Sequence, residues 1–158
     1  MPQLVKGGKY IFGWSVVDED GRIILPGEAV AEYGIEPGER VLLMSGSRTS
    51  GGFSVSRKST VERSNLSDIL VQNPDLAGFR TEEGQIIKSG TRSLCWLTTA
   101  AGGDLLLLPP VLEAYGVTPG ECLLATRGSY IGIGMLVKGP IVSEAIGHPE
   151  IPVFQVGR

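Results

Sequence analysis

The sequence repeats itself at a fixed spacing of 82 residues. Trp14 recurs as Trp96, and Tyr-Gly-Ile-Glu-Pro-Gly-Glu at 33–39 recurs as Tyr-Gly-Val-Thr-Pro-Gly-Glu at 115–121, without a gap. Many glycines and apolar residues match at the same offset, which indicates an internal duplication. Two copies of one unit commonly pack about a two-fold axis. A site in one copy should therefore have a retained or a lost counterpart in the other.

The composition favours a compact protein with many short elements. The chain has 158 residues, 42% of them hydrophobic, with 23 glycines and 10 prolines. A chain of this length can bury roughly 70% of the surface exposed when it is unfolded. Frequent glycine and proline favour short strands and tight turns over long helices. We expect one compact, mainly β domain.

The charge and the cysteines indicate which partners the protein can bind and in which cellular compartment it occurs. The net charge is -3 at pH 7, so the chain as a whole does not attract phosphates and nucleic-acid binding requires a local basic patch. Cys95 and Cys122 lack a CxxC spacing and lie in apolar runs, which predicts buried, reduced thiols and a cytoplasmic protein. The longest apolar run, Leu105 to Leu108, is too short to span a membrane.

Each repeat is predicted to contain strand, strand, helix, strand and strand. Pro26 suits the start of the helix and Gly34 its left-handed end. In repeat one the expected elements are strands 14–17 and 22–25, helix 26–33, and strands 40–44 and 53–57. In repeat two they are strands 95–99 and 104–108, helix 111–115, and strands 121–126 and 135–138.

The repeats account for most of the chain. We assign residues 1–63 to repeat one, 64–84 to a helical and polar linker, and 85–158 to repeat two, together forming one compact domain. The linker has a helical pattern over 64–71, and a shortened equivalent is expected at 141–146 after repeat two.

Part of repeat one resembles a known family. Val-Asp-Glu-Asp-Gly-Arg-Ile-Ile-Leu-Pro at 17–26, Tyr-Gly-Ile at 33–35 and Gly-Glu-Arg-Val at 38–41 are similar to the swapped-hairpin domain of AbrB, MazE and SpoVT transition-state regulators and antitoxins. In that family two short chains exchange hairpins to close a β-barrel, and basic residues from the first hairpin and the helix start grip DNA. The resemblance implies a mainly β, pseudo-two-fold swapped-hairpin (double-split) barrel formed within one chain, with short helices.

The resemblance also implies a DNA-binding transcriptional regulator. The basic residues expected to contact double-stranded DNA are Lys9, Arg22, Arg40 and Arg48. Three consecutive acidic residues, 18–20, lie on the turn that would approach the phosphates and oppose that role. An ordinary solvated surface is the alternative.

Two matched glycine-rich loops suggest a second function. Backbone amides in such loops can form a concave anion site, and an arginine in each loop can add charge-assisted hydrogen bonds. The expected residues are Ser45, Gly46, Ser47, Arg48, Gly52, Arg127, Gly128, Ser129 and Gly134. The alternative function is therefore that of a non-enzymatic barrel that binds a small molecule or a phosphate ligand. The loops can also be interpreted as flexible hairpin connections that need glycine only for their turns.

No residue pattern indicates an enzyme. His148 is the single histidine, no motif marks a nucleophile, and one histidine with two distant cysteines does not give metal-ligand spacing. We expect no catalytic residue, no metal and no cofactor. Trp14 and Trp96 fit core packing better than a stacking platform. The expected assembly is a monomeric pseudo-dimer or a low-order homo-oligomer, and an antitoxin-like interaction module is a third possibility.

Overall fold

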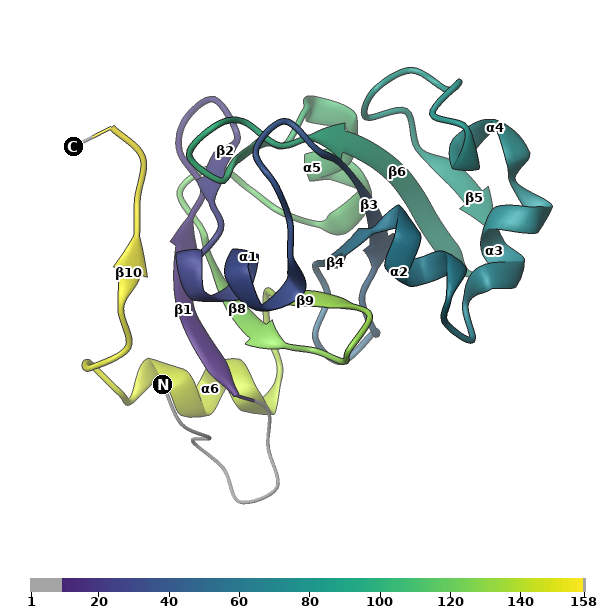
Figure 1. Ribbon diagram of the computed structural model, residues 1–158. Helices are drawn as coiled ribbons and strands as arrows, with labels where there is room; N and C mark the ends of the chain where they lie inside the picture. Colours follow the sequence, from purple (N-terminus) through teal and green to yellow (C-terminus); the bar gives the residue numbers. More distant parts are fainter. Residues whose placement is uncertain (1–9, 158) are drawn as a thin grey trace.

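The computed structural model describes residues 10–157 and is mainly β, with a large mixed sheet and a few short helices (Figure 1). The sheet has eight strands in the order β10-β1-β8-β9-β4-β3-β6-β5, and β2 and β7 form a separate two-stranded sheet. Repeat one contains β1 (Ile11–Val16), β2 (Arg22–Ile24), α1 (Gly27–Tyr33), β3 (Arg40–Ser45), β4 (Phe53–Arg57) and α2 (Lys58–Glu62). The linker region contains α3 (Ser67–Gln72) and α4 (Pro74–Ala77). Repeat two contains β5 (Ile87–Ser89), β6 (Arg92–Thr98), β7 (Asp104–Leu106), α5 (Pro109–Tyr115), β8 (Cys122–Arg127), β9 (Gly132–Leu136), α6 (Pro140–Ile146) and β10 (Val153–Phe154).

Local sequence signals end the helices and form the turn between β1 and β2. Gly34 ends α1 with φ 68°, and Gly116 ends α5 with φ 66°, a left-handed conformation that suits glycine. The Asp18 carboxylate accepts hydrogen bonds from the backbone N–H groups of Asp20 and Arg22 at 2.9 and 2.8 Å. This carboxylate therefore fixes the turn between β1 and β2.

The first long strand of each repeat pairs with the second half of the other repeat, so the hairpin expected between residues 14–17 and 22–25 does not form a ladder. Strand β1 lies antiparallel to β8, with Trp14 opposite Leu124. Strand β6 lies antiparallel to β3, with Trp96 opposite Leu42. These two residue pairs are related by the 82-residue offset. The repeats are thus interleaved through their strands.

The pairing register also locates a pseudo-two-fold axis. Ile23 lies opposite Leu105 in the two-stranded sheet, and Phe53 lies opposite Met135 at the centre of the large sheet. In both cases a residue faces its own counterpart 82 positions along the chain. Only positions on a two-fold axis can do this, so the axis runs through both pairs.

The interior follows this symmetry. One cluster of buried apolar side chains combines residues of both repeats, among them Phe12, Phe53, Leu105 and Met135. Two smaller clusters cover the outer faces of the sheet, one under α2, α3 and α4 around Trp96, and one beneath α6. Trp14 is partly buried in the second of these, so both tryptophans occupy packing positions.

The ends of the sheet depart from the predicted pattern. The short strands β5 and β10 form its two edges, β5 antiparallel to β6 and β10 parallel to β1, and neither was predicted. Helix α3 begins at Ser67 instead of residue 64, because the Ser64 hydroxyl accepts the backbone N–H of Leu66 and closes a turn there. The prediction of two buried thiols is wrong for Cys122, which is exposed at the start of β8, whereas Cys95 is buried.

The backbone pairings leave two structural expectations open. In residues 10–157 the hydrogen-bonded ladders form an open sheet with β10 and β5 at its edges, so closure into a barrel stays a prediction. The boundaries of the repeats and linker stay predictions as well. Within the same residues, no helix has the length and apolar character needed to cross a membrane.

Candidate anion site

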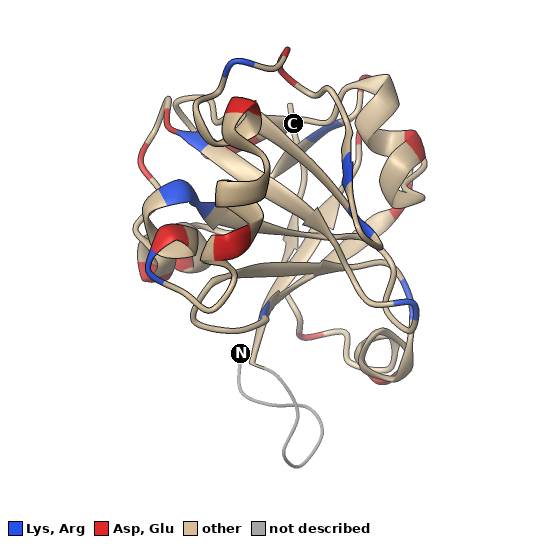
Figure 2. Ribbon diagram, turned by 90° about the vertical axis from the view of Figure 1, so that its right-hand side faces the viewer, with Lys and Arg blue, Asp and Glu red and all other residues tan. Residues whose placement is uncertain are grey.

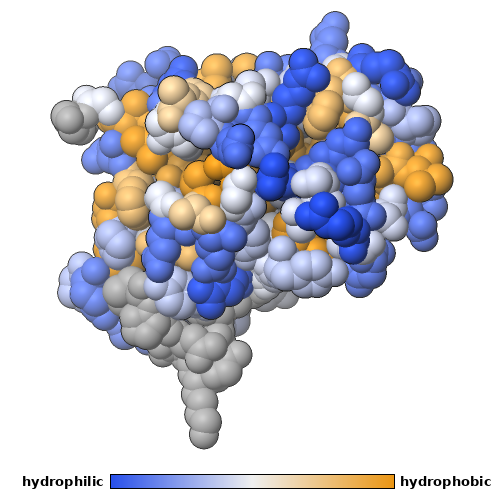
Figure 3. All heavy atoms as spheres, viewed as in Figure 1, coloured by the Kyte–Doolittle hydropathy of each residue, from blue (hydrophilic) through white to orange (hydrophobic). Residues whose placement is uncertain are grey.

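A groove lies between the end of α1, helix α2 and the loop that joins β8 to β9. Its volume is about 480 Å³. We call it the arginine groove, and it is lined by Glu32, Tyr33, Gly34, Arg57, Thr60, Arg63, Arg127, Ser129 and Tyr130. Figure 3 shows strongly hydrophilic side chains over the region of α2. Both repeats contribute, so the interleaved fold assembles this surface.

The transition from β4 to α2 places one wall of the groove. Arg57 ends β4 and is also the N-cap residue of α2, so no loop separates strand from helix. Arg57, Thr60 and Arg63 follow at intervals of three, which puts their side chains on one side of the helix. All three line the groove.

The opposite wall is tied to α1 by polar contacts between the repeats. Arg127 donates two hydrogen bonds to the Glu32 carboxylate at 2.5 and 2.6 Å. The guanidinium also lies over the Tyr10 ring, 4.5 Å from its centroid. The Tyr33 hydroxyl donates to the Ser129 carbonyl at 2.5 Å. These contacts hold the β8–β9 loop against the helix.

The same contacts set the protonation states of the groove. The hydrogen bond from Arg127 lowers the pKa of Glu32, which keeps that carboxylate ionised at neutral pH. Burial raises the pKa of Tyr33 to about 12, with the Glu32 charge as a smaller cause, so the phenol stays protonated and can donate.

The arginines differ in how far they are neutralised. Arg57 donates to Glu39 at 2.7 Å, and this hydrogen bond raises the pKa of Arg57. Arg63 is exposed, and within residues 10–157 its side chain forms no hydrogen bond or ion pair. Arg57 and Arg127 are each paired with a glutamate, and Glu36 also acts on the charge of Arg57, whereas Arg63 has no ion pair within residues 10–157.

The groove offers several hydrogen-bond donors. A guanidinium carries five N–H donors, so Arg57 keeps four and Arg127 keeps three after their pairing with glutamates. Within residues 10–157 neither Thr60 nor Ser129 hydrogen-bonds through its hydroxyl to a histidine or carboxylate. The described residues also hold no cluster of three His, Cys, Asp or Glu side chains suited to a metal ion. This arrangement can bind an anion.

The structure separates the two glycine-rich loops. Arg127 and Ser129 of the second loop line the groove, with Gly128 beside them in the chain, and Gly134 has already entered β9 opposite Ser54. The first loop lies at the other end of the sheet, because β4 and β9 are antiparallel. There its residue Ser50 accepts the backbone N–H groups of Val137 and Lys138. The two loops therefore do not form one site.

The first loop uses its own polar groups. The N–H of Gly46 donates to the Gly52 carbonyl at 3.0 Å, and the N–H of Gly51 donates to the Ser47 carbonyl at 2.8 Å. The Ser45 hydroxyl accepts the backbone N–H of Ser93 at 3.0 Å. These groups are unavailable to an anion in this conformation, although Arg48 is exposed. Anion binding by the first loop stays a prediction.

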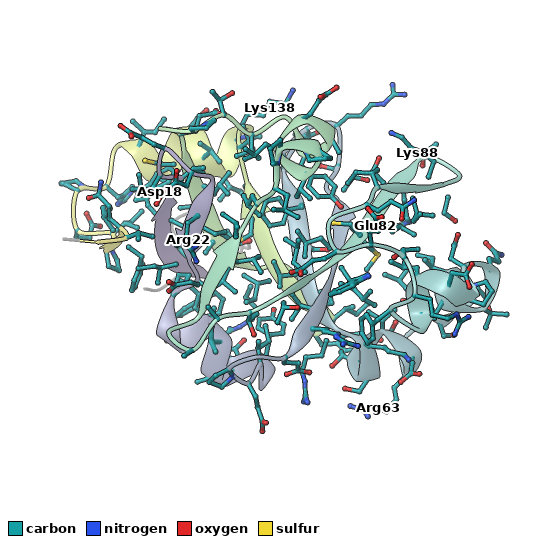
Figure 4. All side chains as sticks on the ribbon, turned by 90° about the horizontal axis from the view of Figure 1, so that it is seen from above. Asp18, Arg22, Arg63, Glu82, Lys88 and Lys138 are labelled. Atoms are coloured by element: carbon teal, nitrogen blue, oxygen red, sulfur yellow. The ribbon has the colours of Figure 1, made fainter. Side chains whose placement is uncertain are left out.

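The described residues that were predicted to bind DNA lie on separate elements. Arg22 lies on β2 near Asp18, while Arg63 and Lys138 project from other sides of the molecule (Figure 4). Arg40 packs against the rings of Phe79 and Trp96, at 5.3 and 5.4 Å from their centroids. Figure 2 shows basic positions scattered among acidic ones.

Arg48 and Lys9 are the remaining two residues that were predicted to bind DNA. Arg48 lies in the first glycine-rich loop, far along the chain from Arg22 and on a different hairpin, and Lys9 falls outside the described residues. Binding of DNA by these four residues stays a prediction.

The groove has lost its counterpart at the other end of the molecule. Arg57 and Arg63 correspond to Gly139 and Ala145, and Arg127 corresponds to Ser45. Our sequence-based list of site residues omitted Arg57, Thr60 and Arg63. The signal that identifies them is Arg-x-x-Thr-x-x-Arg directly after a predicted strand, because repeat two lacks it at the matching positions.

Comparisons with known proteins give little guidance. No family model matches the chain, and no curated protein matches it. The solution structure of PHS018 from Pyrococcus horikoshii is similar at a TM-score of 0.37 and 14% identity, over 82% of this chain and 97% of that chain. A likeness at this level supports no functional argument.

Proposed function

We propose that this chain is a non-catalytic binding protein whose arginine groove takes a small anionic ligand, with a phosphate group as the anion. The observation that carries the proposal is the convergence of Arg57, Arg63 and Arg127, from three elements and both repeats, on one hollow. This proposal applies the ligand-binding alternative to the second glycine-rich loop, whose residues Arg127 and Ser129 line the groove.

The dimensions and the chemistry of the groove suit such a ligand. Its volume of about 480 Å³ lies within the roughly 300–1,000 Å³ typical of small-molecule sites. Planar guanidinium groups match the geometry of phosphate oxygens, and charge-assisted hydrogen bonds are about twice as strong as neutral ones. Glu32 and Glu39 hold two of the guanidinium groups in place before the ligand arrives.

Isothermal titration with inorganic phosphate and pyrophosphate tests the proposal. We expect Arg63→Ala to weaken binding about tenfold or more, because a hydrogen bond to a charged group contributes roughly 1.5–3 kcal/mol. Arg92→Ala is the matched control, since it removes an exposed arginine at the start of β6, outside the groove. Absence of binding, or equal affinity of the wild type and Arg63→Ala, would overturn the proposal.

A second candidate is a DNA-binding regulator with the AbrB-like swapped-hairpin barrel. The observation in its favour is that the first strand of each repeat pairs with the second half of the other repeat, since the resemblance implies an exchange between the two copies. The shared core cluster, with Ile23 and Leu105 of the two-stranded sheet inside it, supports a closed interior. In this second proposal the protein acts in the cytoplasm, and its single chain forms the pseudo-dimer.

A titration with mixed duplex DNA at several salt concentrations separates the two candidates. Association with DNA releases counterions and strengthens as salt is lowered. A DNA-binding protein of this type would lose affinity when Arg22 and Arg40 are both replaced by alanine. A flat signal at low salt would remove this candidate and leave the anion site unaffected.

A further inference from the structure

Tyr130 is an exposed aromatic residue at the edge of the arginine groove. It lies on the β8–β9 loop, lines the groove together with the three arginines, and is 70% exposed. A large ring left in water does not gain the free energy that burial of its apolar surface would give. In a groove that also presents cations, such a ring is a surface on which a planar ligand can stack.

The loop around Tyr130 is anchored on both sides. Before it, the Ser129 carbonyl accepts the Tyr33 hydroxyl, and the Ser129 hydroxyl accepts the backbone N–H of Ile131 at 3.1 Å. After it, Ile131 packs against the apolar cluster beneath α2. The backbone at Tyr130 is therefore held in position, and ordering the ring for a ligand costs less conformational entropy than it would in a free loop.

The other tyrosine of the groove cannot take this role. Tyr33 is half-buried and uses its hydroxyl to hold Ser129. Its counterpart in repeat two, Tyr115, is buried, and its hydroxyl donates to the carbonyls of Leu43 and Ser93. Both side chains support the fold, which leaves Tyr130 as the ring presented to the groove.

We propose that the ligand of the arginine groove is a nucleoside monophosphate, with its phosphate bound by Arg63 and Arg57 and its base stacked on Tyr130. This inference rests on the proposed anion site and adds the chemical class of the group that carries the anion. A nucleoside monophosphate combines a doubly charged phosphate with a planar base, and the groove offers guanidinium donors beside an exposed ring.

The duplication supports the pairing of ring and cations. The residue equivalent to Tyr130 is Arg48 of repeat one. The residues equivalent to Arg57 and Arg63 are Gly139 and Ala145 of repeat two. The aromatic ring and the arginines therefore occur together at one end and are absent together from the equivalent positions at the other. A ligand that uses both features explains this joint difference.

Three ligands and three variants test the inference by isothermal titration. The ligands are AMP, ribose 5-phosphate, which lacks the base, and adenosine, which lacks the phosphate. Base stacking on an aromatic side chain contributes enough to change affinity about fivefold to a hundredfold. We expect AMP to bind the wild type at least fivefold more tightly than ribose 5-phosphate, and adenosine to bind most weakly.

The variants assign this preference to the ring. Tyr130→Ala should lower the affinity for AMP to that for ribose 5-phosphate. Tyr130→Phe should keep the preference for AMP because it keeps the ring. Arg63→Ala should weaken both phosphate compounds by a similar factor. Because Tyr130 is exposed, its replacement should leave the thermal unfolding temperature unchanged.

The outcomes separate the two proposals. If ribose 5-phosphate binds as tightly as AMP, or if Tyr130→Ala keeps the preference for AMP, the nucleotide inference is overturned and the anion site stands. If neither AMP, ribose 5-phosphate nor pyrophosphate binds, the anion site itself is wrong and the nucleotide inference falls with it.

Discussion

The two ends of the sheet share one backbone plan and differ in the side chains that cover them. At one end Arg57 leads into α2 and contributes to the arginine groove. At the other end Gly139 leads into α6, and the positions equivalent to Arg63 and Arg127 hold Ala145 and Ser45. Within residues 10–157, the second end therefore lacks the convergent arginines.

The comparison separates what the fold requires from what a site requires. Residues on the pseudo-two-fold axis stay large and apolar in both copies, as in Ile23 with Leu105 and Phe53 with Met135. The arginines line the groove and lie outside the shared core cluster, so they can differ between the copies while the core is kept. Covalent linkage of the copies allows one end to specialise while the shared interior is kept.

Replacing a residue on the axis should have the largest effect, because it removes packing from both repeats at once. Phe53 is 1% exposed, and its ring lies 5.3 Å from that of Tyr115. We expect Phe53→Ala to lower the free energy of unfolding by about 3–5 kcal/mol. Chemical denaturation followed by tryptophan fluorescence measures this change.

A control accompanies that measurement. Val71 is 76% exposed on α3, so Val71→Ala should change stability by less than about 0.5 kcal/mol. A loss below about 1 kcal/mol for Phe53→Ala would contradict a core shared by both repeats.

Two equivalent glycines should respond differently to alanine. Gly52 has φ +67°, and a Cβ there would collide with the Met135 carbonyl oxygen. Gly134 does not have a positive φ, and its Cβ would meet the Thr126 hydroxyl at 2.8 Å, a side-chain atom instead of backbone. We expect the free energy of unfolding to fall by about 2–3 kcal/mol for Gly52→Ala and by about 1 kcal/mol for Gly134→Ala.

Thermal unfolding of both glycine variants gives the comparison directly. Equal losses would show that the two hairpin loops have the same backbone requirement. The difference that we describe between the first and second loops would then be wrong.

The smallest effect should come from His148 after α6, whose counterpart at the arginine-groove end is Leu66. Hydrogen bonds from His148 to Glu150 and Glu144, both at 2.9 Å, raise the pKa of this histidine above its ordinary value of 6.5. The same bond lowers the pKa of Glu150 below 4.5. The contribution of the charged histidine is full below pH 6.5 and is lost as pH rises through the raised pKa. The contribution of Glu150 is lost as pH falls through its lowered pKa.

Unfolding temperatures measured across pH test this prediction. His148→Leu should be less stable than the wild type near pH 5.5 and should approach it at pH 9, where the native histidine is neutral. A difference of equal size at both pH values would show that His148 acts through packing instead of charge.

Sequence reasoning located the elements that carry strong local signals. Strand β4 has the predicted bounds 53–57, and Gly34 and Gly116 end α1 and α5 as glycine in a left-handed conformation. Strands β5 and β10 were missed because they contain three and two residues, too few for an alternating pattern. Helix α2 was missed because it follows β4 without a turn or a side-chain cap.

The arginine groove overlaps in part with the residues that the sequence suggested for an anion site. Arg127 and Ser129 were expected in an anion site, and they line the groove. Arg57 and Arg63 were not expected there, since their proximity to Arg127 depends on the pairing of β4 with β9 across the two repeats. That pairing joins segments about 80 residues apart, and no local pattern in the sequence specifies it.

The central claim is that one end of a duplicated fold has become an anion site while the other has not. Backbone amide shifts recorded by NMR during titration with pyrophosphate test it at both ends in one experiment. The account predicts concentration-dependent shifts at residues 32–34, 57–63 and 127–131, and unchanged signals at 45–48, 114–116 and 139–145. Equal shifts at both ends, or shifts confined to the second set, would contradict it.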